Sequence, residues 1–317
     1  MPTVADIRTA AERIAPYVRA TPLVQMTPSR LWLKAECLHP TGAFKLRGAF
    51  NAILSLEDEQ RARGVVAHSS GNHAQAVAYA AAALGVRAVI VMPSDAPAIK
   101  LEATRRYAPE IVIVGPASSE RAMRAAQIAC AEGLAPIEPY SATATIAGTA
   151  TIALEMLDAK PDVETIYVPV SGGGLIGGIA LAVKLLAPHV RVIGAEPEVA
   201  ADALASLRAG RLVELPGEQM ALTIADGLRV QRLGALNWPL VRDHVDDIAT
   251  VSEDAIIATM RRIALEARLV AEPSGAVAPA AALEAYIDPE RCIAILSGGN
   301  VDPALFARAM APIGSLC

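Results

Sequence analysis

The sequence predicts an α/β protein of two lobes, in which each lobe is a mostly parallel sheet flanked by helices. From Gly64 onward, short apolar runs alternate with alanine-rich amphipathic stretches, and this alternation is typical of βαβ units. A second series of the same kind begins at Thr165, and an apolar run from Cys292 to Ser297 closes it. No low-complexity linker separates the two series, so we expect the lobes to share an interface that contains the site.

The expected elements follow one another in a regular order. The chain should open with a helix, because apolar residues recur at helical spacing after Thr3, and Pro16 then ends or bends that helix. The first series has strand and helix segments at 64–68, 72–84, 87–92, 99–107, 110–114 and 119–132. The second series has segments at 165–170, 175–186, 190–196 and 200–207 before the last strand. We expect a small lobe of residues 48–140 to close on a larger lobe of residues 1–47 and 141–317.

The composition favours a compact protein that acts on a small molecule. Hydrophobic residues make up 53% of the 317 residues and charged residues 19%, which argues against a disordered chain. The net charge of −5 argues against binding to nucleic acid or to an anionic membrane. No signal peptide and no membrane-spanning helix are expected, so the protein should be cytoplasmic. The cysteines lack CxxC spacing, so we expect no zinc site.

A glycine-rich loop follows the strand that begins at Thr165. A helical pattern starts at once after it, and its sequence is Ser171-Gly172-Gly173-Gly174-Leu175. Such a loop can direct several backbone N–H groups at a phosphate, beside the positive end of the helix. Only glycine lets the backbone approach a ligand so closely. The structural alternative is an ordinary glycine-rich turn.

The same loop supports a competing interpretation. It satisfies GxGxxG through Gly172, Gly174 and Gly177, and Glu196 lies near the end of the next strand. In a dinucleotide-binding fold, an acidic residue at such a place binds the ribose, so a nicotinamide-dependent oxidoreductase is the competitor. A lone GxGxxG is weak evidence, however, and it explains only one of the loops in this chain.

Two further loops follow strands in the same manner. The first offers N–H groups and two hydroxyls at a helix start, which suits a substrate carboxylate, and its sequence is Ser69-Ser70-Gly71-Asn72-His73. The second begins at Ser297, whose hydroxyl could hydrogen-bond a ring nitrogen. The structural alternatives are N-capping by serine and a glycine turn.

Together, these motifs resemble the fold-type II pyridoxal-phosphate enzymes, which have a tryptophan synthase beta-like fold. The resemblance is specific to the threonine/serine dehydratase and serine racemase branch, and it covers nearly the whole chain. It implies that Lys45, next to Phe44, carries pyridoxal 5′-phosphate as a Schiff base. It implies that residues 171–175 cradle the phosphate and that Ser297 is the partner of the pyridine nitrogen. Residues 69–73 would bind the substrate carboxylate, with Asn72 near the phenolic oxygen of the cofactor.

The resemblance also implies further partners. In some members, a divalent cation such as Mg²⁺ binds at positions that match Glu196, Asp202 and the backbone carbonyl of Ala200. The structural alternative for these acids is a solvated helix start. A small amino acid substrate and a homodimer are implied as well.

The chemistry that the resemblance implies is β-elimination from a 3-hydroxy amino acid such as threonine or serine, giving a 2-oxo acid and ammonia. Lys45 would be the base, and the neutral hydroxyl of Ser297 favours prompt loss of the β-substituent. Ser70 matches a second acid/base of the racemases, so a serine or aspartate racemase stays open as an alternative. Ala43 replaces a common serine, as in dehydratases of 3-hydroxyaspartate, so 3-hydroxyaspartate and phenylserine also stay open as substrates.

Overall fold

The computed structural model describes residues 1–311, and the chain divides into two compact units. Unit 1 comprises Met1–Ala20 and His39–Ile152, and unit 2 comprises Thr21–Leu38 and the chain from Ala153 onward. Each unit contains a sheet with parallel strands and helices around it, so the expected α/β class is confirmed. The bounds of the units differ from those of the expected lobes, and the division at 48 and 140 stays a prediction. No helix within residues 1–311 is long and apolar enough to cross a membrane.

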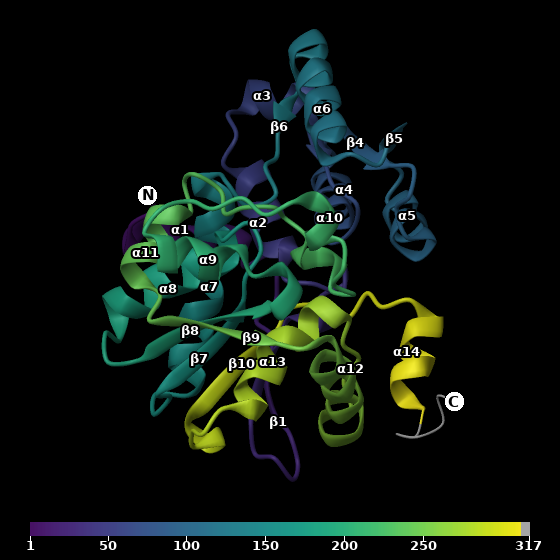
Figure 1. Ribbon diagram of the computed structural model, residues 1–317. Coiled ribbons are helices and arrows are strands. Elements are labelled where there is room, and N and C mark those ends of the chain that lie inside the picture. The colour runs from purple at the N-terminus through teal and green to yellow at the C-terminus, as the bar shows by residue number, and fades with distance from the viewer. Residues whose placement is uncertain (312–317) are drawn as a thin grey trace. The chain divides into compact units, whose positions relative to one another are not determined.

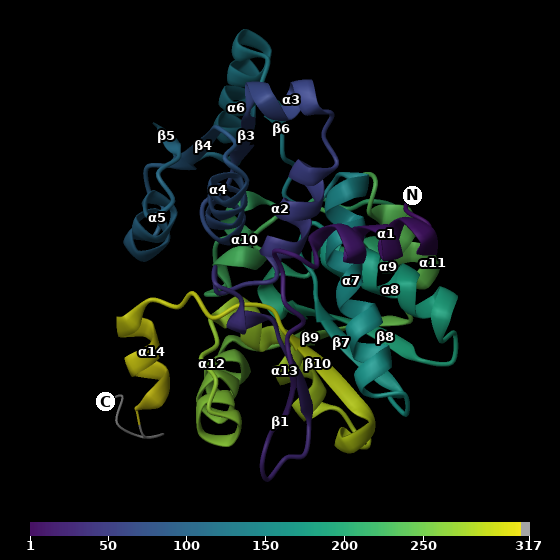
Figure 2. The same ribbon diagram turned by 180° about the vertical axis from the view of Figure 1, so that it is seen from behind.

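The sheet of unit 1 has four strands, all parallel, in the order β5-β4-β3-β6. The strands are β3 (Val65–His68), β4 (Ala88–Pro93), β5 (Glu110–Val114) and β6 (Ala135–Pro136). One of its two central strands, β4, is buried along its whole length, as its continuous apolar sequence requires. In Figure 2, β3, β4, β5 and β6 are seen with α4 and α6 beside them.

Helices cover both faces of this sheet. They are α1 (Val4–Ile14), α2 (Lys45–Leu54), α3 (Asp58–Arg63), α4 (Asn72–Leu84), α5 (Ala98–Arg105) and α6 (Ser118–Glu132). The side chains of Val65, Ala67 and Ile90 pack with α2 and α4 on one face, whereas Val66 and Val89 pack with α6 on the other. This alternation along β3 and β4 follows from the two-residue period of a strand.

Unit 2 contains a six-stranded sheet in the order β1-β2-β10-β7-β8-β9. The strands are β1 (Leu23–Gln25), β2 (Trp32–Ala35), β7 (Thr165–Pro169), β8 (Arg191–Pro197), β9 (Asp247–Val251) and β10 (Cys292–Leu296). All neighbours are parallel except β1 and β2, which form an antiparallel pair that the sequence analysis did not anticipate. Figure 1 shows β7, β8, β9 and β10 side by side.

The helices of unit 2 are α8 (Gly174–Leu186), α9 (Asp202–Ala209), α10 (Gly217–Met220), α11 (Trp238–His244), α12 (Glu253–Arg262), α13 (Pro273–Glu284) and α14 (Pro303–Met310). On one face of the sheet, Ile193 and Ala195 pack with α12 and α13. On the other face, Gly194 leaves room for Ile176 of α8. Helix α7 (Thr143–Ala159) runs through the division between the units at residue 152.

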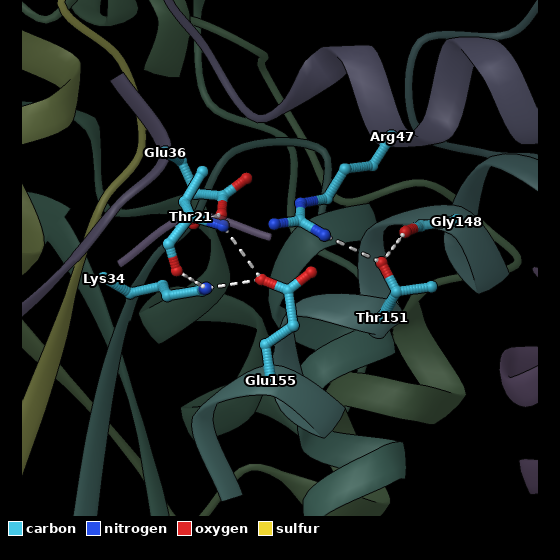
Figure 3. A network of polar contacts seen from close by, with 7 residues as sticks. All are labelled: Thr21, Lys34, Glu36, Arg47, Gly148, Thr151 and Glu155. Carbon is cyan, nitrogen blue, oxygen red and sulfur yellow. Dashed lines mark hydrogen bonds and ion pairs between the residues drawn. The ribbon is translucent and has the colours of Figure 1, made fainter. Parts of the chain in front are cut away.

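A partly buried ion pair in unit 2 lies where the chain enters and leaves that unit (Figure 3). The ammonium of Lys34 is 2.5 Å from Oε2 of Glu155 and 2.5 Å from the carbonyl oxygen of Thr21. The hydroxyl of Thr21 donates to Glu36 at 2.6 Å. These contacts join the two ends of the segment Thr21–Leu38 to each other and to the start of the second segment of unit 2.

Candidate active site

Lys45 is the first residue of α2, and contacts within unit 1 hold its amine in place. The amine donates to the carbonyl oxygen of Pro139 at 2.7 Å and lies 5.0 Å from the centroid of the Phe44 ring. The side chain keeps some exposed surface, but the surrounding protein excludes most of the water, and this burial lowers the pKa of Lys45 to about 8. An amine with this pKa is half neutral at about pH 8, so a far larger share of it is in the neutral form that a nucleophile or a base requires than for an ordinary lysine.

The helix that begins with Lys45 packs closely on α7. A Cβ on Gly148 would lie 2.6 Å from the carbonyl oxygen of Arg47, and a Cβ on Gly48 would lie 2.9 Å from Cγ2 of Thr145. Two polar contacts cross the same helix pair. Asn51 donates to the carbonyl of Ala144 at 2.7 Å, and buried Arg47 donates to the hydroxyl of Thr151 at 3.2 Å (Figure 3).

This close packing is a part of the site that the sequence analysis missed. The chain has Gly48 and Gly148 on the two helices, but their pairing depends on a contact between residues about 100 positions apart. The packing fixes the position and direction of α2, and therefore the place from which the side chain of Lys45 starts.

The loop of Ser69 to His73 connects β3 to α4, as expected. Gly71 is the N-cap of α4 and offers no side chain to the first N–H groups of the helix, and Ser69 accepts a hydrogen bond from the N–H of Gly71 at 3.1 Å. The N–H groups of a helix start and the helix dipole favour an anion at this place. Ser70 and Asn72 remain partly exposed there.

Lys100 lies against this loop, and the sequence analysis did not single it out. A Cβ on Gly71 would lie 2.7 Å from Cδ of Lys100 and 3.4 Å from its Nζ, so this side chain lies directly on the loop and would have to shift for a larger residue at position 71. Lys100 is buried, and its positive charge adds to that of the helix start. In the sequence, Lys100 is one lysine in a helix of both polar and apolar residues, and nothing there distinguishes it from a lysine on the surface.

His73 has a different environment from the rest of the loop. Its Nε2 is 2.8 Å from the carbonyl oxygen of Ile137, so the ring nitrogen that would donate is occupied within the fold. Burial, followed by the charge of Lys45, lowers the pKa of His73 to about 3. The imidazole is therefore neutral under ordinary conditions, and its contact orients the start of α4 on the segment that leads to Pro139.

The glycine-rich loop of unit 2 connects β7 to α8, as expected for a phosphate cradle. Gly173 is the N-cap of α8 and has φ +85°, a left-handed conformation that favours glycine. A Cβ there would also lie 2.8 Å from Leu233 and 3.0 Å from Cβ of Asn237. No side chain caps the helix, and its first N–H groups are suited to a phosphate.

Ser297 follows β10 and is buried, and Ser274 of α13 lies beside it. Its hydroxyl lies 3.4 Å from the carbonyl oxygen of Ser274, and the hydroxyl of Ser274 accepts the N–H of Gly227 at 2.9 Å. A Cβ on Gly275 would lie 2.2 Å from the carbonyl oxygen of Gly298, so the backbone directly after Ser297 is in close contact with α13. This packing holds the hydroxyl of Ser297 in one place.

The expected metal ligands lie at the end of β8 and the start of α9. Glu196 accepts the N–H groups of Ala203 and Leu204 at 3.1 and 2.9 Å, and Ala200 is buried in the turn between the two acids. Burial, followed by the charge of Asp202, raises the pKa of Glu196 to about 8, and burial raises the pKa of Asp202 to about 7. Both carboxylate oxygens of Asp202 are buried and have no hydrogen-bond partner of good geometry.

This pair of acids does not form a metal centre by itself. Within residues 1–311, no group of three or more His, Cys, Asp or Glu side chains could hold a metal ion. Two side chains and one carbonyl leave about half of the six positions around a cation such as Mg²⁺ to water.

Comparison with known proteins gives one consistent result. The family described as "Pyridoxal-phosphate dependent enzyme" matches residues 9–298. The chain is 43% identical to a serine racemase of Oryza sativa subsp. indica, covering 94% of this chain and 90% of that protein. It is 40% identical to an L-threo-3-hydroxyaspartate ammonia-lyase of Saccharomyces cerevisiae, covering 97% and 96%. The solved structure of maize serine racemase is similar, with a TM-score of 0.91, 42% identity and coverage of 97% and 96%.

Proposed function

Because the chain belongs to the family of pyridoxal-phosphate dependent enzymes, we propose that it removes water from a 3-hydroxy amino acid and releases a 2-oxo acid and ammonia. The observation that carries the proposal is the amine of Lys45, which starts a closely packed helix and has a pKa lowered to about 8. The bound cofactor supplies an electron sink for the substrate's Cα. A neutral amine at this place can accept the proton that leaves Cα.

The other residues bind and orient. The start of α4, with Lys100 behind Gly71, attracts the substrate's carboxylate. The N–H groups of residues 171–175 bind the cofactor's phosphate, and the conformation of Gly173 fits this role. The hydroxyl of Ser297 would be the neutral partner of the ring nitrogen, which would limit the charge that the ring can hold and favour loss of the β-hydroxyl.

The proposed function is tested by following the 2-oxo acid and the chirality of the remaining amino acid together. The substrates are serine, threonine, phenylserine, and erythro- and threo-3-hydroxyaspartate. We expect at least one of them to give a 2-oxo acid, and failure of all of them would refute a dehydratase. Lys45→Ala should abolish both turnover and the visible absorbance of the lysine-bound cofactor, and a retained band would show that another residue carries the cofactor.

Racemisation is the second candidate, and Ser70 is the residue that favours it. Ser70 lies in the turn before α4 with a partly exposed hydroxyl, and a hydroxyl beside the substrate can return a proton to Cα from the face opposite to the lysine. The similar serine racemase of Oryza sativa makes the same activity a candidate here. Ser70→Ala should then remove racemisation and leave elimination, whereas parallel loss of both would assign Ser70 to substrate binding instead.

The substrate could also carry a second carboxylate, and Arg121 favours this. Its Nε is buried with no hydrogen-bond partner. Burial lowers the pKa of His68, the residue before Ser69, and the charge of Arg121 lowers it further. A guanidinium near the substrate loop with an unused donor suits a carboxylate. Arg121→Ala should lower kcat/KM for 3-hydroxyaspartate and spare threonine. Arg124→Ala, on the same helix, is the matched control.

A divalent cation at Glu196, Asp202 and the carbonyl of Ala200 is a further part of the proposal. The carboxylate oxygens of Asp202 have no well-aligned partner in the protein, and a cation would compensate their burial. Addition of MgCl₂ to chelator-treated protein should raise Tm, and Asp202→Asn should remove the shift while Asp158→Asn retains it. An unchanged Tm in the unmodified protein would exclude a structural cation.

We also propose a cytoplasmic homodimer. Leu222 and Leu236 of unit 2 are large apolar side chains with exposed fractions of 67% and 53%. A second copy of the chain would bury such side chains. Light scattering after size-exclusion chromatography should give twice the chain mass, and a monomeric mass would contradict the dimer.

A further inference from the structure

Asn237 precedes α11 in unit 2, and its side chain is used in an unusual way. An asparagine at the N-cap of a helix commonly accepts a hydrogen bond from the first turn of that helix. Asn237 is the N-cap of α11, yet its side chain makes no such bond, and the residue is completely buried. The buried amide is therefore directed away from its own helix.

The amide donates instead to the glycine-rich loop. Nδ2 of Asn237 lies 2.5 Å from the carbonyl oxygen of Gly172, and the backbone N–H of Gly234 donates to the same oxygen at 3.0 Å. One carbonyl of the loop thus accepts two hydrogen bonds from residues 234–237. Asn237 is 65 positions further along the chain than Gly172.

These two bonds fix the direction of a peptide group. In a trans peptide, the C=O of Gly172 and the N–H of Gly173 point in opposite directions. Because the carbonyl is held on the side of Asn237, the N–H of Gly173 must point to the opposite side, away from residues 234–237. The left-handed φ of Gly173 is the conformation that permits this arrangement.

The same segment also closes the loop from behind. A Cβ on Gly173 would meet Leu233 at 2.8 Å and Cβ of Asn237 at 3.0 Å, so there is no room for the loop to turn over toward this side. The peptide between Gly172 and Gly173 is thus held by two donors and blocked by two side chains.

We propose that Asn237 is a positioning residue for the cofactor's phosphate: it holds the carbonyl of Gly172 so that the N–H of Gly173 faces the phosphate. The inference rests on the proposed function, because it takes residues 171–175 as the phosphate loop. It adds the residue that determines which way the loop's N–H groups point. Without the amide, only the N–H of Gly234 holds this carbonyl, so the peptide has more freedom and the phosphate loses part of the advantage of a donor that is already oriented.

The test compares two cofactor forms on protein freed of its cofactor. Pyridoxal 5′-phosphate and pyridoxal share the ring and the reaction with Lys45, but only the first has a phosphate. For Asn237→Asp, which keeps the size of the side chain and replaces the donor by an acceptor, we expect Kd for pyridoxal 5′-phosphate to rise about tenfold or more, as for loss of a hydrogen bond to a charged group. Kd for pyridoxal should change by less than about twofold.

Asn237→Ser is the matched variant. Serine is a good N-cap for α11 but is too short to reach the carbonyl of Gly172, so it should behave like Asn237→Asp if the donor matters. If Asn237→Ser binds pyridoxal 5′-phosphate as tightly relative to pyridoxal as the unmodified protein does, Asn237 acts only on its helix and the inference is wrong. Equal losses for both cofactor forms in either variant would also overturn it.

A measurement on the unmodified protein makes the test independent of whether the variants fold. In glycine-labelled protein, the amide resonance of Gly173 should shift on addition of pyridoxal 5′-phosphate or of inorganic phosphate, and pyridoxal alone should leave it in place. If the Gly173 amide resonance does not shift on addition of phosphate, the inference is wrong even if the cofactor binds. If the unmodified protein takes up no cofactor through Lys45, the proposed function fails instead, and the two failures are thereby distinguished.

Discussion

The contact between α2 and α7 predicts that Gly148→Ala is harmful even though alanine is the better helix former. A Cβ at residue 148 would lie 2.6 Å from the carbonyl oxygen of Arg47 and 2.9 Å from Cβ of Asn51. The first distance is 0.8 Å shorter than the 3.4 Å of an ordinary contact, and the atom in the way belongs to the backbone of α2. The two helices must therefore move apart, because no side chain can turn aside.

The magnitude follows from opposing effects. Overpacking of this kind costs about 1–3 kcal/mol, and separation of the helices also weakens the bond from Asn51 to Ala144, which contributes about 1 kcal/mol. The helix propensity of alanine returns up to about 1 kcal/mol. We expect a net loss of about 1–3 kcal/mol in the free energy of unfolding.

The assay is urea unfolding followed by circular dichroism, with the slope compared between variants. Gly217→Ala is the control, because a Cβ there meets only Gln231 at 3.4 Å and stability should change by less than about 0.5 kcal/mol. An unchanged or raised stability of Gly148→Ala would refute the idea that the backbone of α2 blocks this position. Because α2 begins with Lys45, we also expect the variant to weaken the contact between Lys45 and Pro139.

Three further predictions concern buried charges. Lys34→Met should lower the free energy of unfolding by about 2 kcal/mol in urea titrations, because it removes the partner of Glu155. The loss is no larger because the side chain of Glu155 is 22% exposed, and water partly screens its charge. A loss below about 0.5 kcal/mol would mean that the ion pair does not stabilise the fold. Cofactor uptake by the free protein should accelerate as pH rises through about 8, because the neutral form of Lys45 reacts, and a rate independent of pH between about 7 and 9 would contradict the lowered pKa. The imidazole resonances of His73 should not titrate above about pH 5, since its pKa is lowered to about 3, and a midpoint near about 6 would place the ring in water.

The sequence was sufficient to predict the α/β class and the order of the strands from Gly64 to Val114, because apolar periodicity is a local signal. It also predicted that Ser69, Ser171 and Ser297 directly follow strands, and they follow β3, β7 and β10. The antiparallel pair of β1 and β2 was missed because both strands are short and their pairing depends on β10. Whether these serines perform the expected roles stays a prediction.

Supporting contacts could not be predicted, because they join residues without any shared local pattern. Gly227 meets Ser274, and Lys100 lies on Gly71, in each case across a long stretch of chain. Motifs identify which residues can bind a ligand, whereas these contacts determine how the residues are held.

The glycine-rich loop illustrates why that difference matters for function. A run of glycines permits many backbone conformations, so the sequence Ser171 to Leu175 by itself specifies no direction for its N–H groups. The direction comes from Asn237 and Gly234, which hold one carbonyl on the side away from the expected ligand. The flexibility that lets the backbone approach a phosphate therefore requires a rigid support elsewhere in the fold. A dinucleotide-binding loop could share the GxGxxG pattern. A search for that pattern alone would detect neither the hydrogen bonds from Asn237 and Gly234 nor Lys45 at the start of α2.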